Sequence, residues 1–288
     1  MEDFLSAVRT IYASTMSEKA LRYREQRGLL NHDEQMALLI MRVSGSMHGR
    51  YFYPQAAGVG FSFNPYVWHE SIDPKAGVLR VVFGLGTRAV DRSDDDYTRL
   101  VALNAPHRRP EASFEQVRQY AQRRVDYLDL EANRLMSGHF LDVAKDSTDV
   151  PMEMFASSDE SCLSAAGSAE RAWVPTFDGL LRDTDFVKDM RDILRILQEA
   201  YEYPVDVEFT LNFVADGRYK IHVVQCRPLA VKGIETPQPP TVKIRQADRI
   251  IEAGGAVIGH SRRTRISRFV YVVPAAYSQL PLQDRHEV

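Results

Sequence analysis

The stretch from Val205 to Phe213 constrains the fold more than any other part of this sequence. Apolar residues take its five odd positions and polar residues its four even positions, and this pattern predicts a half-buried strand. Asp216-Gly217 predicts a hairpin turn, because both residues tolerate the positive φ angles of tight turns. Tyr219 to Val224 predicts the return strand, which stops at Pro228 because proline cannot donate to a strand ladder. The sequence therefore predicts an antiparallel hairpin.

The hairpin gathers polar side chains on one face. Asp206 and Glu208 share that face, because side chains alternate along a strand. A four-residue loop, Ala215 to Arg218, would place Glu208 opposite Gln225 and Asp206 opposite Arg227. The same register leaves apolar residues near the turn on the polar face, so we expect a β-bulge to reconcile the two ends of the hairpin.

Two carboxylates, an amide oxygen and a guanidinium on one surface suit a phosphate-binding site. Mg²⁺ takes one or two carboxylates and completes its shell with water and phosphate, so Glu208 and Gln225 are the candidate metal ligands. Arg227 can fork onto a phosphoryl oxygen, and Arg227 and Asp206 are the candidate catalytic residues. The alternative is an ordinary amphipathic hairpin with exposed polar residues, which is the better interpretation for any one of these residues taken alone.

Two motifs of the hairpin carry a resemblance when they are taken together. Val-Asp-Val-Glu-Phe at 205–209 and Val-Gln-Cys-Arg-Pro at 224–228 are similar to the Asp-Ile-Glu-Trp and Gln-Ala-Arg-Pro motifs of phosphoenolpyruvate synthase and pyruvate phosphate dikinase. These motifs belong to the nucleotide-binding domain of that family, which has an ATP-grasp fold. The resemblance implies an α+β, ATP-grasp-like C-terminal lobe with a mainly antiparallel sheet and packed helices. It also implies ATP and Mg²⁺ as cofactors.

The apolar run from Met36 to Val43, broken only by Arg42, predicts a buried strand. It resembles the family's strand that joins the two ATP-grasp lobes and meets the adenine edge with its backbone. The resemblance therefore makes Met41 and Val43 candidate cofactor-binding residues. The family usually has Gln where this chain has Met41, so the expected contacts are those of the backbone.

Two glycine-containing segments agree with the same family. Gly58 to Pro65 resembles its Ser-Gly-Val-Ala-Phe-Thr-Arg-Asp-Pro segment, and Gly84 to Val90 follows a predicted strand and resembles its Gly-Leu-Gly-Glu segment. Thr87 stands where the family has an acid. Without the resemblance, a glycine pair after a strand is more often a turn than a phosphate-binding loop.

Helical periodicity predicts helices over 3–15, from Ser17 to Gly28 and over 186–201. Between about 107 and 175 we expect a helical insertion, with one apolar helical stripe over 114–135. The predicted sheet is built from strands near 36–44, 57–64, 78–84, 205–213 and 218–226.

The predicted domain organisation has three parts. Residues 1–232 form a partial ATP-grasp domain, 233–240 are a linker by their proline content, and 241–288 begin a further, truncated segment. That last segment includes a predicted strand from Phe269 to Val273, and the acidic run Asp91 to Asp96 predicts a solvated loop.

Composition excludes several classes of protein. The 288 residues carry a net charge of −3, which gives no reason to expect nucleic-acid binding. No apolar run approaches the ~20 residues that span a bilayer, so no membrane partner is expected. Cys162 and Cys226 have neither metal-ligand nor redox spacing, which favours the cytoplasm.

The resemblance implies an enzyme of three cooperating parts. The ATP-grasp domain passes phosphoryl from ATP to a histidine on a swivelling domain, which delivers it to pyruvate at a barrel domain. We expect the lobe with the glycine-rich loop to lie upstream of residue 1, and the phosphohistidine and PEP/pyruvate domains to act in cis or in trans from outside this chain. The isolated chain should then be inactive.

Two classes of function remain open from the sequence. The first is the ATP-binding part of a dikinase-type phosphotransferase. The second is a non-catalytic nucleotide-sensing or docking module that retains the ATP-grasp fold. Relatives that share this unit serve pyruvate, a glucan or an antibiotic, so the resemblance does not choose the final acceptor.

Overall fold

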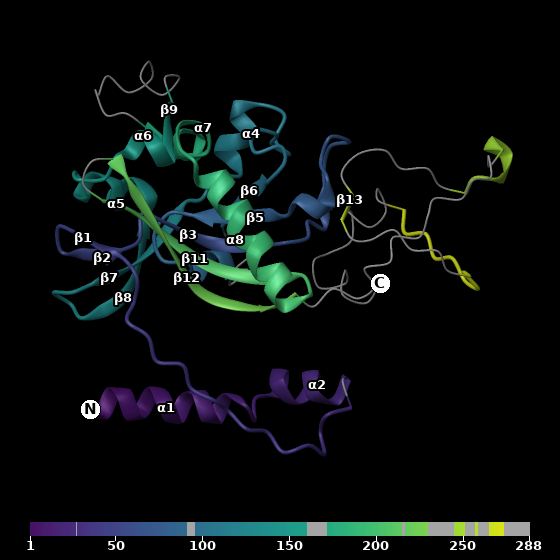
Figure 1. The fold of residues 1–288 in the computed structure, drawn as a ribbon, viewed down its shortest axis with the longest axis horizontal. Helices are drawn as coiled ribbons and strands as arrows, with labels where there is room; N and C mark the ends of the chain where they lie inside the picture. The colour runs from purple at the N-terminus through teal and green to yellow at the C-terminus, as the bar shows by residue number, and fades with distance from the viewer. Residues whose placement is uncertain are drawn as a thin grey trace. The chain divides into compact units, whose positions relative to one another are not determined.

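The computed structural model describes residues 1–26, 28–90, 96–159, 172–214, 217–229, 245–250, 257–258 and 265–273. The chain divides into two compact units, Met1–Ser44 and Gly45–Val288. Figure 1 shows the ribbon of both units. The predicted linker at 233–240 lies outside the described residues.

The first unit contains two successive helices, followed by residues 28–44, which form no helix or strand. Helix α1 (Glu2–Ser14) and helix α2 (Glu18–Gln26) confirm the two predicted helices. Ser17 caps α2, because its Oγ accepts the backbone N–H of Ala20 at 3.3 Å. Gly28 follows α2 with a φ of +69°, a conformation that ends helices.

The predicted strand at 36–44 is wrong. Residues 36–44 form no strand, and the side chains of Leu39 and Ile40 are strongly exposed, at 73% and 68%. A strand needs a neighbouring strand to satisfy its backbone groups, whereas the regular elements described in this unit are helices. An apolar run indicates a tendency to be buried but does not supply the partner strand.

The second unit is built around a five-stranded antiparallel sheet. Four of its strands confirm predicted strands. The fifth is β6, whereas the predicted strand at 36–44 is not part of the sheet. The order is β12 (Tyr219–Pro228), β11 (Val205–Phe213), β3 (Ala56–Phe61), β5 (Val78–Val82) and β6 (Arg99–Ala102).

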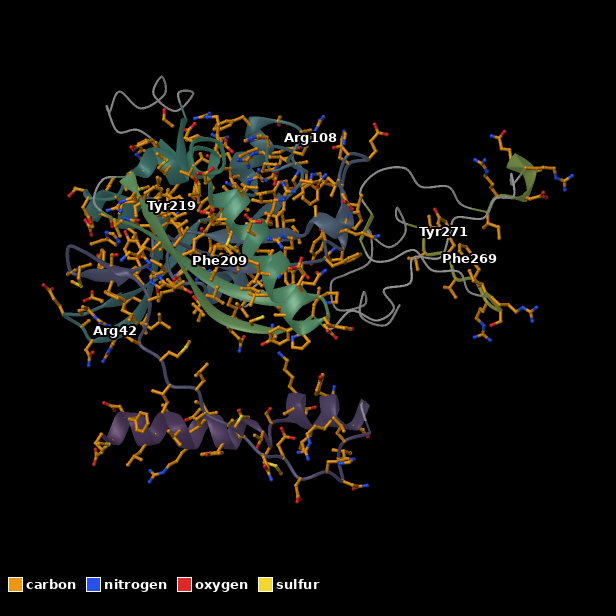
Figure 2. The ribbon with its side chains drawn as sticks, viewed as in Figure 1. Arg42, Arg108, Phe209, Tyr219, Phe269 and Tyr271 are labelled. Carbon is orange, nitrogen blue, oxygen red and sulfur yellow. The ribbon has the colours of Figure 1, made fainter. Side chains whose placement is uncertain are left out.

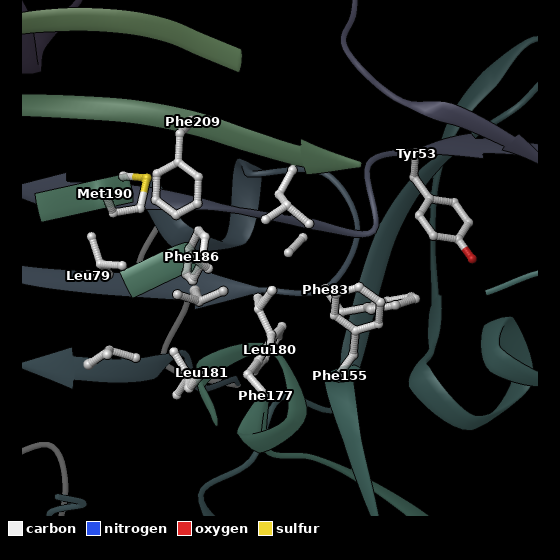
Figure 3. Packing of buried hydrophobic residues seen from close by; sticks show 14 of the residues in the cluster. Tyr53, Leu79, Phe83, Phe155, Phe177, Leu180, Leu181, Phe186, Met190 and Phe209 are labelled. Atoms are coloured by element: carbon white, nitrogen blue, oxygen red, sulfur yellow. The ribbon is translucent and has the colours of Figure 1, made fainter. Parts of the chain in front are cut away.

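Helix α8 (Phe186–Tyr201) covers one face of this sheet and confirms the predicted helix. Its buried residues Phe186, Met190 and Leu194 recur every four positions and so lie on one side of the helix. The rings of Phe186 and Phe209 pack with their centroids 5.8 Å apart, and Figure 3 shows Phe186 and Met190 beside Phe209. This contact buries the apolar side of the hairpin and leaves the polar side facing the opposite direction.

The region from 107 to 175 differs from the expected helical insertion. Helix α4 ends at Gln119, and the predicted stripe over 114–135 is wrong beyond that point, because the chain continues as the hairpin of β7 and β8. In β7, Val125, Tyr127 and Asp129 are buried at every second position, which is the period of a strand. The elements of this region are α4 (Phe114–Gln119), β7 (Arg124–Asp129), β8 (Arg134–His139), α5 (Phe140–Asp146), α6 (Met152–Phe155), β9 (Ala156–Asp159) and β10 (Ala172–Pro175).

The described residues form three smaller sheets besides the central one. Strands β1, β2, β7 and β8 form a four-stranded sheet, and β9 pairs with β10 and β4 with β13. The remaining elements are β1 (Ser46–His48), β2 (Tyr51–Tyr53), β4 (Tyr66–Val67), η1 (Pro74–Ala76), α3 (Thr87–Val90), α7 (Asp178–Asp183), η4 (Gln246–Asp248) and β13 (Val257–Ile258).

The predicted strand from Phe269 to Val273 is also wrong. These residues form no strand, and Phe269 and Tyr271 are exposed, whereas Phe209 is buried among the side chains of the sheet (Figure 2). None of the helices in the described part of the chain combines the length and apolar character that crossing a bilayer requires.

Candidate functional site

The register of the β11–β12 hairpin confirms the predicted cross-strand pairs. Glu208 pairs with Gln225, and Asp206 pairs with Arg227. Residues opposite each other in an antiparallel pair extend from the same face of the sheet. The two pairs therefore lie in adjacent rows of one polar face.

The expected β-bulge is present on β12, opposite the step from Glu208 to Phe209 of β11. Glu208 pairs with Gln225 while Phe209 pairs with Val223, so Val224 is the extra residue. The bulge shifts the turn end of β12 by one position, and Tyr219 packs against the core instead of lying on the polar face. With Val224 inserted, polar residues pair with polar residues at the Pro228 end of the hairpin, and apolar residues pair with apolar residues at the turn end.

Asp206 and Arg227 form an ion pair within this face. Arg227 Nε donates to Asp206 Oδ2 at 2.8 Å, and Arg227 Nη2 lies 2.8 Å from the same oxygen. The Asp206 side chain is only 9% exposed, whereas that of Arg227 is 55% exposed. Asp206 Oδ1 is buried and has no hydrogen-bond partner among the described residues. The pair holds an accessible guanidinium and leaves one carboxylate oxygen unsatisfied, as expected where a donor or cation is to bind.

Glu208 and Gln225 form the neighbouring pair. Glu208 is half-buried and Gln225 is exposed, and directly paired residues have Cβ atoms about 4.5–5.5 Å apart. No three His, Cys, Asp or Glu side chains of the described residues form a metal-binding cluster. Two oxygen ligands beside an unsatisfied carboxylate oxygen nevertheless fit Mg²⁺, which keeps several waters and takes phosphate oxygens as further ligands.

Arg80 lies in the same cross-strand row as Glu208. Val59 pairs with Glu208 on one side and with Arg80 on the other. The Arg80 guanidinium carbon lies 5.3 Å from the ring centroid of Phe61, which pairs with Asp206. Sequence reasoning missed Arg80, although it is the one charged residue of the apolar strand β5, and that isolated charge was the available signal.

Two further contacts orient Arg80. Its Nη2 donates to Tyr66 Oη at 2.7 Å, and its guanidinium carbon lies 5.7 Å from the centroid of the Tyr66 ring. No carboxylate of the described residues forms an ion pair with Arg80. A cation is therefore held on the polar face by aromatic rings and a phenol oxygen.

The glycine segment after β5 has a structural role in the described contacts. Gly84 has a φ of +88°, and a Cβ there would lie 2.5 Å from Val125 Cγ1, so only glycine fits the close approach to β7. Thr87 Oγ1 and Arg88 Nε donate to Asp126 at 2.7 and 2.9 Å. These bonds attach the start of α3 to β7. Thr87, which stands where the family has an acid, uses its hydroxyl in this contact.

Asp96 corrects the expectation of a solvated acidic loop. Its side chain is 4% exposed and forms an ion pair with Arg88. It also accepts the backbone N–H groups of Arg123 and Arg124 at 2.7 and 2.9 Å. A carboxylate with these donors is a structural acceptor that joins α3 to the start of β7. Residues 91–95 lie outside the described residues.

Met41 and Val43 belong to a different unit from the hairpin. Both are exposed and lie in the unit Met1–Ser44, whereas the hairpin belongs to the unit Gly45–Val288. Their expected contact with the adenine edge stays a prediction from the resemblance.

Comparison with known families accounts for most of the chain. The profile of the family described as pyruvate phosphate dikinase, AMP/ATP-binding domain, matches residues 1–248. No curated protein matches the chain. The match spans both units, including the hairpin. The chain belongs to the pyruvate phosphate dikinase AMP/ATP-binding domain family.

Proposed function

We propose that the polar face of the β11–β12 hairpin binds the phosphates of Mg-ATP and supports transfer of phosphoryl from ATP to a histidine on a separate domain. The observation that carries this proposal is the pairing of Glu208 with Gln225 beside that of Asp206 with Arg227 on one sheet face. The family supplies ATP as the nucleotide.

Arg227 is the residue that we assign to the phosphates. Its side chain is accessible, and a guanidinium offers five N–H donors in a planar fork. Asp206 engages Nε and Nη2, which leaves further N–H groups for a phosphoryl oxygen. Asp206 is then a positioning residue, because its carboxylate fixes the orientation of the fork before the nucleotide binds.

Glu208 and Gln225 are the residues that would hold Mg²⁺. The bound ion neutralises phosphate charge and orients the phosphate chain. Arg80 adds a second cation on the same face. Phosphoryl transfer depends mostly on positioning and charge neutralisation, and these side chains supply both without a nucleophile of their own.

The acceptor supplies the nucleophile in this reaction. A lone pair of the acceptor imidazole forms the new phosphorus–nitrogen bond as the phosphorus–oxygen bond to the nucleotide breaks. The leaving oxygen keeps the bonding electron pair, and cations on the polar face stabilise the charge that develops there. We also propose that the backbone of Met41 and Val43 meets the adenine edge, on the basis of the family resemblance.

The test measures both ATP binding and phosphoryl transfer. Calorimetry measures the affinity of the 288-residue chain for ATP with and without MgCl₂, and labelled ATP reports transfer when the glycine-rich lobe and the phosphohistidine domain of a dikinase are both added in trans. Wild type, Glu208→Ala and Arg227→Ala are compared with Lys220→Ala, which removes an exposed charge from the same hairpin. We expect Glu208→Ala to lose the magnesium dependence and Arg227→Ala to lose affinity, with Lys220→Ala unchanged.

The same experiment separates the two classes of function. Magnesium-dependent binding without labelling of the histidine domain would favour a nucleotide-sensing module. Equal affinity and equal labelling in wild type, Glu208→Ala and Arg227→Ala would leave the hairpin a structural element and overturn the proposal.

A further inference from the structure

A second polar site lies on the opposite side of the central sheet. A pocket of about 420 Å³ opens between η1, the end of β3 and one side of α8. Its lining includes Lys75 from η1 and Lys188, Arg191 and Arg195 from α8. The three α8 residues are spaced by three and four positions, so they lie on one side of the helix.

The cations of this pocket are only partly neutralised. Asp192 also lines the pocket, and Arg195 contacts Asp192 and Glu199 at 3.5 and 3.2 Å. Lys75, Lys188 and Arg191, in contrast, form no ion pair with any carboxylate of the described residues. Three like charges at close spacing repel one another, and an anion bound between them would remove that repulsion.

Nearby acids are engaged by other groups. Asp73 Oδ1 accepts the backbone N–H of Lys75 at 2.9 Å. This bond anchors η1 and does not involve the side-chain ammonium group of Lys75. Asp189 Oδ2 accepts the hydroxyl of Tyr219 at 2.6 Å. Lys188 lies in the first turn of α8, where the helix dipole adds positive potential. Among the residues that line the pocket, four are cationic and Asp192 is the one acid, so the lining carries net positive charge.

Neutral donors complete the lining. Ser62 Oγ accepts the backbone N–H of Val205 at 2.9 Å, so its hydroxyl hydrogen is directed to another acceptor. Gln198 adds an amide group at the far side of the pocket. A compact anion would therefore meet ammonium, guanidinium, hydroxyl and amide donors.

The pocket is distinct from the polar face of the hairpin. Leu194 lines the pocket and also packs under the sheet, where a Cβ on Gly60 would lie 3.4 Å from it. Gly60 pairs with Val207, which lies on the apolar face of β11, whereas Asp206 and Glu208 extend from the other face. The two sites are therefore on opposite sides of one sheet.

We propose that the pocket between η1 and α8 binds a small organic or inorganic anion with two or more negative charges, carried by phosphate or carboxylate groups. The net positive charge of the lining favours an anion, and the volume of about 420 Å³ suits a small ligand. This proposal does not depend on the function of the hairpin.

The experiment uses the full 288-residue chain after divalent cations are removed on a chelating resin, in a buffer without multivalent anions, so that binding does not depend on magnesium. Calorimetric titration with pyrophosphate and, separately, with citrate tests the two anion chemistries. The Lys188→Ala/Arg191→Ala variant is compared with Arg108→Ala/Arg134→Ala, which removes two exposed cations that form no ion pair within the described residues. Arg227→Ala reports any binding of the probe to the hairpin.

We expect wild type to bind at least one probe and Lys188→Ala/Arg191→Ala to bind it about tenfold or more weakly, because hydrogen bonds to charged groups are lost. Both other variants should bind as wild type does, and the preferred probe identifies the anion chemistry. The proposal is overturned if neither probe binds, if the α8 variant binds as tightly as wild type, or if Arg227→Ala loses as much affinity as the α8 variant.

Discussion

The two faces of β11 have different roles, one in packing and one in the proposed site, although their residues alternate along one strand. Phe209 is buried against Phe186 of α8, and its neighbour Glu208 extends to the polar face beside Gln225. The apolar face connects the sheet to its helix, while the polar face carries the pairs of Asp206 with Arg227 and Glu208 with Gln225. Substitutions at successive positions should therefore separate stability from nucleotide chemistry.

Phe209→Ala should have the largest effect. Truncating a fully buried phenylalanine costs about 3–5 kcal/mol of folding free energy, because contacts are lost and a cavity remains. Urea denaturation followed by circular dichroism measures this loss. If Phe209→Ala unfolds at the same midpoint as wild type, the sheet and α8 do not form the packed core described above.

Glu208→Ala and Arg227→Ala should have the opposite profile. Each should lower phosphoryl transfer by about 10²–10³-fold, the usual cost of removing one preorganised electrostatic partner. The free energy of unfolding of Glu208→Ala should stay within about 0.5 kcal/mol of wild type, whereas Arg227→Ala should lose about 1 kcal/mol, because it leaves the buried Asp206 carboxylate without its partner. Labelling of the partner histidine and urea denaturation measure the two quantities.

Thr210→Ala is the control for this pair of variants, because Thr210 lies on the same face of β11 but nothing assigns it to the phosphates. Its transfer rate should fall far less than that of Glu208→Ala. A comparable loss in Thr210→Ala would show that the rate responds to any change on this face.

Asp206→Asn should have an intermediate effect on both quantities. It keeps the shape of the side chain but removes the charge that orients Arg227. Because Arg227 is more than half exposed, solvent screening limits the expected loss of stability to about 1 kcal/mol. ATP affinity should fall with it, and calorimetry measures that change. Lower stability with unchanged ATP affinity would assign Asp206 to the fold alone.

Tyr219→Phe should have the smallest effect of the series. It removes the hydroxyl that donates to Asp189 Oδ2 at 2.6 Å and keeps the aromatic packing against Phe213. One such hydrogen bond contributes about 0.5–1.5 kcal/mol, so thermal unfolding should shift slightly and nucleotide binding should not. A loss of ATP affinity would show that the turn end of β12 and the polar face are coupled.

Local patterns of the sequence determined the hairpin and the helix that packs on it. The period-two alternation of β11, with an assumed four-residue connection, predicted the pairs of Glu208 with Gln225 and Asp206 with Arg227, and the apolar spacing over 186–201 predicted α8. Asp216 of the predicted turn lies outside the described residues. These features depend on residues near one another in the chain, because turn geometry and side-chain direction fix them.

Contacts between segments that are distant in the sequence determined the features that local patterns did not predict. The apolar run 36–43 and the short strand β6 both had strand-like composition, and only the structure shows that β6 pairs with β5. Arg80 reaches the Phe61 ring, and Lys75 faces the cations of α8, across segments that are distant in sequence. Composition sets the tendency of a segment to be buried, but a strand and a charged pocket exist only where tertiary packing supplies the partner.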